Sequence, residues 1–168
     1  MRNLLKLGAF VALMVVGVQA QAQNKFGHIN SDQLLLLMPE TNVAKTELEI
    51  FNKELEGQLQ EMYAEYQKKV SEFQQGGDLM TEPVKQTKLN NIQDLEGRIN
   101  EFQQTATQSL QEKEVALLTP VIEKAQNAIN LVAKTNKFTY VFDSSKGTIL
   151  FAEESQDITA LVKTELGL

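Results

Sequence analysis

Apolar side chains recur at helical spacing through the middle of the chain, and polar residues fill the positions between them. In the first long segment the spacing alternates between three and four residues, which approximates an eleven-residue repeat of about 3.67 residues per turn. Such a repeat predicts a nearly straight amphipathic helix with one narrow apolar stripe. The stripe consists of Leu48, Phe51, Leu55, Leu59, Met62, Tyr66, Val70 and Phe73.

A second long segment repeats the helical pattern after a short break. Gly76-Gly77 is a stop signal for the first helix, Thr81 can cap the second, and Pro83 fits its first turn. We therefore expect an antiparallel helical hairpin, an arm formed by residues 40–119 with its tip at 76–83. Its second stripe runs through Ile92, Leu95, Ile99, Phe102, Ala106 and Leu110, and resumes at Leu117, Val121, Ala125, Ala128 and Val132.

The two ends of the chain carry shorter patterns. Residues 26–29 alternate like a strand, and Asn30, Ser31 and Asp32 each offer a cap to a short leucine-rich helix. Residues 138–142 and 148–152 also alternate, and they predict a β-hairpin around a turn at 143–147. A last helix follows Ser155 or Asp157. The fold class is therefore α+β, with a β-rich body built from residues 23–39 and 120–168.

A sheet of three short strands with one short helix is marginally stable alone. Sharing its apolar face among subunits is the simplest remedy, so we expect a homo-oligomer with the sheets at its centre. The body residues expected to serve oligomerisation are Phe26, Ile29, Leu35, Phe138, Tyr140, Phe142, Ile149 and Phe151.

Two pairs of residues predict places where the arm bends. Pro39 and Pro120 fall level where the arm meets the body, and a proline inside a helical pattern kinks or ends it. Gly57 and Gly97 fall level midway along the arm, and each weakens a helix by about 1 kcal/mol relative to alanine. We expect a joint at the root and a softer level halfway to the tip.

The first 22 residues have the pattern of a secretory signal peptide. Arg2 and Lys6 precede an apolar run at 7–18, and the run is followed by Ala20 and Ala22, either of which can precede the cleaved bond. The run is shorter than the roughly 20 apolar residues that a membrane anchor needs. We therefore expect an exported protein with no stable membrane insertion after cleavage.

Charge and composition exclude several classes of function. Cleavage leaves 14 basic and 22 acidic residues, a net charge of −8, which argues against nucleic acid or an anionic membrane surface as partner. The chain has no cysteine and a single histidine, His28, which fits a packed position on a strand better than a metal site or catalytic base. Ser144-Ser145 has no nearby base and fits a turn. We expect neither an enzyme nor a cofactor.

The order of elements and two end motifs resemble the Skp/OmpH family of periplasmic chaperones. The motifs are Lys25-Phe26-Gly27-His28-Ile29-Asn30-Ser31-Asp32 leading to Leu37-Met38-Pro39-Glu40, and Phe138-Thr139-Tyr140-Val141-Phe142-Asp143 with Ser155-Gln156-Asp157-Ile158-Thr159. The resemblance implies a homotrimer with a central β-barrel-like body and three arms around a cavity. It also implies a holdase that keeps unfolded outer-membrane proteins from aggregating without ATP. The acidic arm, with 15 acidic and 8 basic residues between Glu40 and Thr119, departs from the basic members and leaves lipopolysaccharide binding open.

Within such a holdase, client contacts must come from apolar residues that the helix pair does not consume. They concentrate in the outer half of the arm and at the tip, at Met62, Tyr63, Tyr66, Phe73, Leu79, Met80 and Val84. Methionine and tyrosine adapt to varied surfaces. For each of these residues, packing within the arm is at least as good an explanation. The alternative function is a structural or adaptor coiled-coil protein of the cell envelope that docks on one defined partner.

Overall fold

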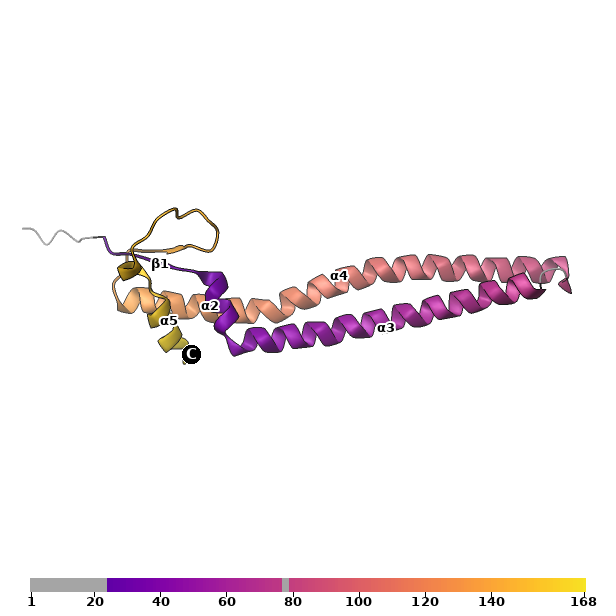
Figure 1. Ribbon diagram of the computed structural model, residues 1–168, viewed down its shortest axis with the longest axis horizontal. Coiled ribbons are helices and arrows are strands. Elements are labelled where there is room, and N and C mark those ends of the chain that lie inside the picture. The colour runs from indigo at the N-terminus through magenta and orange to yellow at the C-terminus, as the bar shows by residue number, and fades with distance from the viewer. Residues whose placement is uncertain (1–23, 77–78) are drawn as a thin grey trace, which may run out of the picture.

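The computed structural model describes residues 24–76 and 79–168, so the expected signal peptide lies outside the described residues. A long pair of helices projects from a small body that contains both short strands (Figure 1). The predicted α+β class with a helical arm is therefore confirmed. Within the described residues, no helix is both long enough and apolar enough to cross a bilayer.

The body begins with strand β1 (Phe26–Ile29) and helix α2 (Ser31–Leu37). The predicted cap is present, because the Asn30 side chain accepts a hydrogen bond from the Gln33 N–H at 2.9 Å. Helix α2 ends before Met38, which is extended, as expected of a residue that precedes proline. The chain then turns into the arm, and the Thr41 hydroxyl donates to the Leu35 carbonyl at 2.5 Å to hold this corner.

The arm consists of α3 (Pro39–Gly76) and α4 (Glu82–Thr135). Pro39 occupies the first position of α3, where its missing N–H costs nothing, and the helix ends at Gly76 as predicted. Thr81 occupies the extended N-cap position of α4, although its side chain makes no cap hydrogen bond, and Pro83 lies in the first turn. Helix α4 is longer than the arm requires: it passes through Pro120 and continues into the body, changing direction on the way (Figure 1).

The two arm helices are joined by an apolar stripe and by ion pairs. Leu95 and Ile99 of α4 are buried against α3. Three ion pairs cross between the helices, each with the lysine on α4 and the glutamate on α3: Lys88–Glu72 at 3.7 Å, Lys113–Glu47 at 3.6 Å and Lys124–Glu40. Exposed pairs are worth about 0–1 kcal/mol each. The ion pairs therefore favour one register of α3 against α4, while burial of the apolar stripe supplies most of the free energy that holds the two helices together.

The hydrophobic core lies in the body, where the last part of α4 meets α2, β1 and α5 (Thr159–Leu166). Small side chains on α4, among them Ala125 and Ala128, allow the neighbouring elements to approach closely. Gly27 serves the same purpose on β1, because a Cβ there would lie 3.0 Å from side-chain atoms of both Phe138 and Ile158. The other buried members are Ile29, Leu34, Met38, Val121, Ile129, Val132, Ile158 and Val162.

The sheet differs from the prediction. It has two strands, β1 and β2 (Tyr140–Asp143), which run parallel with Phe26 opposite Tyr140 and Ile29 opposite Asp143. Parallel strands need a long crossover, and the whole arm provides it. The predicted hairpin is wrong: residues 148–152 form no strand and lead to a short 3-10 helix, η2 (Glu154–Gln156).

The hydrogen bonds of the turn residues explain why the predicted hairpin does not form. Instead of closing a tight hairpin, Asp143 accepts hydrogen bonds from the Ser145 N–H at 2.9 Å and the Ser31 N–H at 3.2 Å. These bonds tie the end of β2 to the start of α2, and the chain leaves the sheet beyond this point.

Candidate functional site

Three aromatic rings form one exposed surface of the sheet. Phe26, Tyr140 and Phe142 lie on the same side because Phe26 pairs with Tyr140 and alternate residues of β2 face the same way. Their ring centroids are 6.0–6.2 Å apart. The three residues remain 42%, 59% and 47% exposed. We call this surface the aromatic face. So large an apolar group on a small body is typical of an interaction surface.

The segment that follows β2 adds to the exposed apolar surface. Leu150 and Phe151 are 96% and 83% exposed, although each would normally be buried in a folded domain. Ile149 and Phe151 were predicted to serve oligomerisation and Leu150 was not, because in the predicted hairpin alternate residues face the same side. Here Ile149 is half-buried.

Other residues expected in the oligomerisation surface contribute to the core of the single chain. Ile29 is buried, and Leu35 and Phe138 pack against the core. The Phe138 ring also receives the Lys25 ammonium at 4.1 Å from its centre. Of the eight body residues, Phe26, Tyr140, Phe142 and Phe151 are the ones with exposed rings.

The predicted client-binding residues are spread along the outer half of the arm rather than gathered in one pocket. Tyr63 is exposed, and its hydroxyl accepts a hydrogen bond from the Gln103 amide at 2.9 Å. Leu79 is 92% exposed at the tip, and Val84 is exposed nearby. Met62, Tyr66, Phe73 and Met80 are half-buried. The Met80 side chain reaches back over Gly76, where a Cβ would lie 2.5 Å from its methyl carbon.

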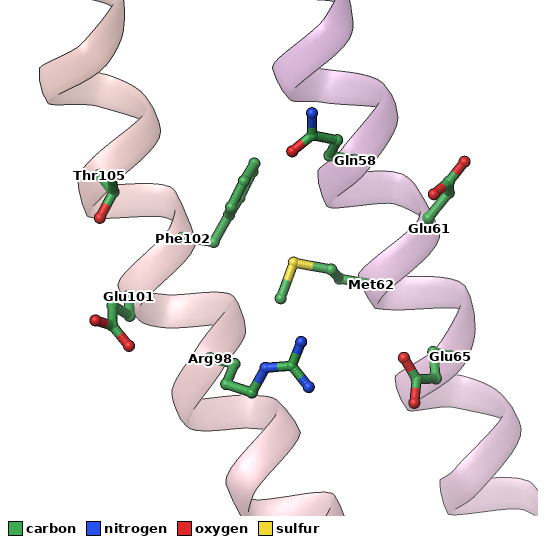
Figure 2. Close-up of a pocket in the computed structure, with 8 residues that line it drawn as sticks. All are labelled: Gln58, Glu61, Met62, Glu65, Arg98, Glu101, Phe102 and Thr105. Atoms are coloured by element: carbon green, nitrogen blue, oxygen red, sulfur yellow. The ribbon is translucent and has the colours of Figure 1, made fainter.

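One of these residues, Met62, lines a groove of about 540 Å³ halfway along the arm. We call it the mid-arm groove. Met62, Phe102 and Arg98 point into the space between the helices, whereas Glu61 on α3 and Glu101 on α4 point away from it to either side (Figure 2). The remaining lining residues are Gln58, Glu65 and Thr105. Phe102 belongs to the predicted stripe, between Ile99 and Ala106, and was not among the predicted client-binding residues.

A second groove lies at the root of the arm, enclosed by α2, α3 and α4. Its volume is about 210 Å³, and its lining is almost wholly apolar. Leu118 and Ile122, which are off the predicted stripe, contribute to it. In the sequence, each of these two residues directly follows a stripe position, at Leu117-Leu118 and Val121-Ile122. Such apolar doublets widen the apolar surface of a helix and could have indicated this groove. Its other apolar lining residues are Leu35, Ala44, Leu48, Leu117 and Val121.

Comparison with known proteins agrees with this architecture. The family model described as Outer membrane protein (OmpH-like) matches residues 25–166. The chain belongs to the OmpH-like family. The match includes the body and the whole arm, so the family resemblance inferred from the two end motifs is confirmed.

Two relatives of this OmpH-like chain are named Chaperone protein Skp. The protein from Photorhabdus luminescens is 22% identical over 162 residues, covering 96% of this chain and 97% of its own. The protein from Photorhabdus laumondii is 24% identical over 166 residues, with the same coverage. The crystal structure of an OmpH-like outer membrane chaperone from Caulobacter crescentus superimposes with a TM-score of 0.76 at 13% identity, covering 89% of this chain and 88% of that one. This likeness confirms the fold.

His28 and Glu40 of this OmpH-like chain take part in hydrogen bonds within the chain. The only histidine, His28, lies on β1 with Nε2 3.1 Å from the Glu153 carbonyl oxygen, to which it can donate. Within residues 24–76 and 79–168, no three His, Asp or Glu side chains gather in a way that could hold a metal ion. The Glu40 carboxylate accepts a hydrogen bond from Lys124, which lowers its pKa.

Asp143 is the most strongly perturbed group. Burial by itself raises the pKa of Asp143, but hydrogen bonds outweigh this effect and lower the pKa from 3.8 to about 2. The Ser31 hydroxyl donates to the carboxylate at 2.6 Å, and the N–H groups of Ser31 and Ser145 add two more bonds. This cluster, the Asp143 clasp, holds the end of β2 and thereby positions Phe142 on the aromatic face.

The clasp predicts an acid-dependent stability. Because the pKa of Asp143 is lower in the folded than in the unfolded chain, its contribution is complete above pH 3.8 and is lost as the pH falls towards 2. Allowing for solvent screening, we expect Asp143→Asn to lower the free energy of unfolding at neutral pH by on the order of 1 kcal/mol. The difference from wild type should shrink towards pH 2, as measured by urea unfolding.

Asp32→Asn is the matched control. Its carboxylate is exposed and pairs only with the exposed Lys146 at 3.3 Å, so its loss should change stability little. Equal stability of the wild type and Asp143→Asn at neutral pH would contradict the role of the clasp.

Proposed function

We propose that this chain is an ATP-independent periplasmic holdase that binds unfolded outer-membrane proteins and prevents their aggregation. The observation that carries the proposal is the arm itself: it is long, and apolar side chains such as Met62 and Leu79 reach solvent along it amid charged and polar residues. Membership of the OmpH-like family and the name of its Skp relatives support the same function. The expected signal peptide supports export to the periplasm.

The physics of the arm suits transient binding of many sequences. Its apolar contacts are small and separated, so each holds a client weakly, and several arms acting together bind it by avidity. Release then needs no nucleotide. The charged and glutamine-rich remainder of the arm keeps bound clients soluble and apart. In this mechanism Met62, Tyr63, Tyr66, Phe73, Leu79, Met80 and Val84 contact the client.

The holdase is a homotrimer in this proposal, with the aromatic faces turned towards one another at its centre. A two-stranded sheet is rarely stable alone, and β2 has an edge that pairs with no strand among the described residues. Contact between copies would cover Phe26, Tyr140 and Phe142 and give Leu150 and Phe151 partners. Three arms projecting from one body would then surround a cavity.

Aggregation measurements test the holdase function. The mature protein should suppress aggregation of a urea-denatured outer-membrane β-barrel on dilution without ATP. Combining Leu79→Ser, Met80→Gln and Val84→Ser should raise the aggregated fraction clearly, whereas each single change should have a small effect because the contacts are dispersed. Failure of the wild type to suppress aggregation would contradict the proposal. Complete loss from one single change would favour an adaptor with one defined docking site.

If the protein is a trimer, a variant that disrupts the aromatic face should have a lower mass in solution than the wild type. Phe142→Glu places a charge in the centre of the aromatic face, and burying it unpaired between copies would be costly. We expect the wild type to have the mass of three chains by light scattering and the variant to dissociate. Val115→Glu, at an exposed apolar position on the arm, is the control and should stay trimeric. A monomeric wild type would rule out the shared-sheet arrangement.

The proposed bending of the arm can be tested at Gly57 and Gly97. A Cβ at either position would meet no atom within 4 Å, so alanine fits both sites. The double alanine variant should be more stable by about 2 kcal/mol, from about 1 kcal/mol per site, because alanine restricts the helical backbone. It should also hold a narrower range of client sizes, measured by co-purification of β-barrels of different length. Gln60→Ala is the control.

Unchanged client range in the double variant, together with unchanged arm mobility by spin-label distances, would contradict a hinge at Gly57 and Gly97. Any residual bending would then be assigned to the root, where α3 starts at Pro39 and α4 contains Pro120.

A further inference from the structure

The negative charge of the arm is concentrated at one level. Residues 54–65 of α3 and 94–101 of α4 contain seven acidic residues and one basic residue, Arg98, a net charge of −6. The rest of the arm, between Glu40 and Thr119, carries eight acidic and seven basic residues and is therefore nearly neutral. This acidic level coincides with the mid-arm groove. A ligand in the mid-arm groove therefore lies in a region of negative charge.

The acidic side chains at this level are not used to join the two helices. The three ion pairs between α3 and α4 lie nearer the tip or nearer the root, at Glu72, Glu47 and Glu40. Among the described residues, Glu61 and Glu101 have no lysine or arginine nitrogen within 4 Å, and Glu65 pairs with Lys69 on its own helix at 3.3 Å. The charges of Glu61 and Glu101 thus remain available to a ligand, and that of Glu65 is shared with Lys69.

The groove between these carboxylates is apolar at its base. Met62 and Phe102 are half-buried and reach towards each other across the gap, with the Arg98 guanidinium beside them (Figure 2). A thioether next to an aromatic ring can accommodate side chains of different shapes. An apolar base with Glu61, Glu65 and Glu101 on its rim is complementary to an apolar side chain flanked by cations.

We propose that the mid-arm groove binds extended client segments in which an apolar side chain is flanked by lysine or arginine. The inference rests on the proposed holdase function and adds the charge of the segments selected. The apolar side chain enters between Met62 and Phe102, and the flanking cations meet Glu61 on α3 and Glu101 on α4. Segments with acidic flanks are repelled at this level and bind elsewhere on the arm or not at all.

Two fluorescein-labelled peptides test this preference directly. They share the same apolar residues and differ only in having lysine or glutamate at the flanking positions. In anisotropy titrations with the mature protein, we expect the lysine peptide to bind about tenfold more tightly at low salt, because several weak exposed ion pairs act together. The preference should decrease as salt is added. Equal affinities, or tighter binding of the glutamate peptide, would overturn the proposal.

Charge-neutral variants assign the effect to the groove. Combining Glu61→Gln, Glu65→Gln and Glu101→Gln should bring the two affinities close together. The control combines Glu49→Gln, Glu112→Gln and Glu123→Gln, which change the net charge equally at exposed positions outside the groove. It should keep the preference. If both variants lose it equally, the preference arises from the overall charge and the groove is not the site.

The apolar base has its own test. Met62→Gln keeps the length of the side chain while adding a polar amide, so it should weaken binding of the lysine peptide several-fold with the helix content by circular dichroism unchanged. Unaltered affinity would overturn the assignment of the apolar side chain to this groove.

Aggregation measurements separate this inference from the function on which it rests. A protein that suppresses aggregation but binds both peptides equally refutes the charge preference alone. One that prefers the lysine peptide but does not suppress aggregation refutes the holdase function alone.

Discussion

The arm and the body both depend on the packing of a single continuous helix, α4. Its first part pairs with α3 to form the arm, and its last part provides the wall of the core against which α2, β1 and α5 pack. A proline within such a helix removes one backbone hydrogen bond, yet α4 continues through Pro120 because packing on either side holds it in place. The direction of the arm is thus set from within the body.

The same helix divides the apolar side chains between stability and binding. In the body, α4 presents a dense set that includes Val121 and Val132, and these are covered. Along the arm it has only α3 as a neighbour, so most of the stripe is half-buried and fully buried positions such as Leu95 and Ile99 are few. Two helices alone cannot bury the whole apolar surface of the arm. Partial exposure is a consequence of two-helix packing, and the proposed binding of unfolded chains would make use of it.

The arm was predictable from sequence because its determinants are local. Periodicity, the glycine stop at Gly76 and the proline in the first turn of α4 each act within a few residues, and the two helices end and begin at the tip as predicted. The sheet was not predictable in the same way. Alternation at 148–152 indicated a strand, but a strand needs a neighbour, and β1 reaches β2 only through contacts across more than 100 residues of chain. The grooves likewise depend on the crossing of two helices, although the clustering of acidic residues near Gly57 and Gly97 was already visible.

The parallel pairing of β1 with β2 has a consequence for biogenesis. The arm joins two helices that follow each other in sequence and can form once both have emerged, whereas the sheet joins β1, which precedes the arm, to β2, which follows it. The aromatic face combines Phe26 from one end with Tyr140 and Phe142 from the other. A chain interrupted during synthesis or export can therefore have a folded arm but not a complete aromatic face. The proposed assembly through this surface would therefore admit only copies that contain both β1 and β2.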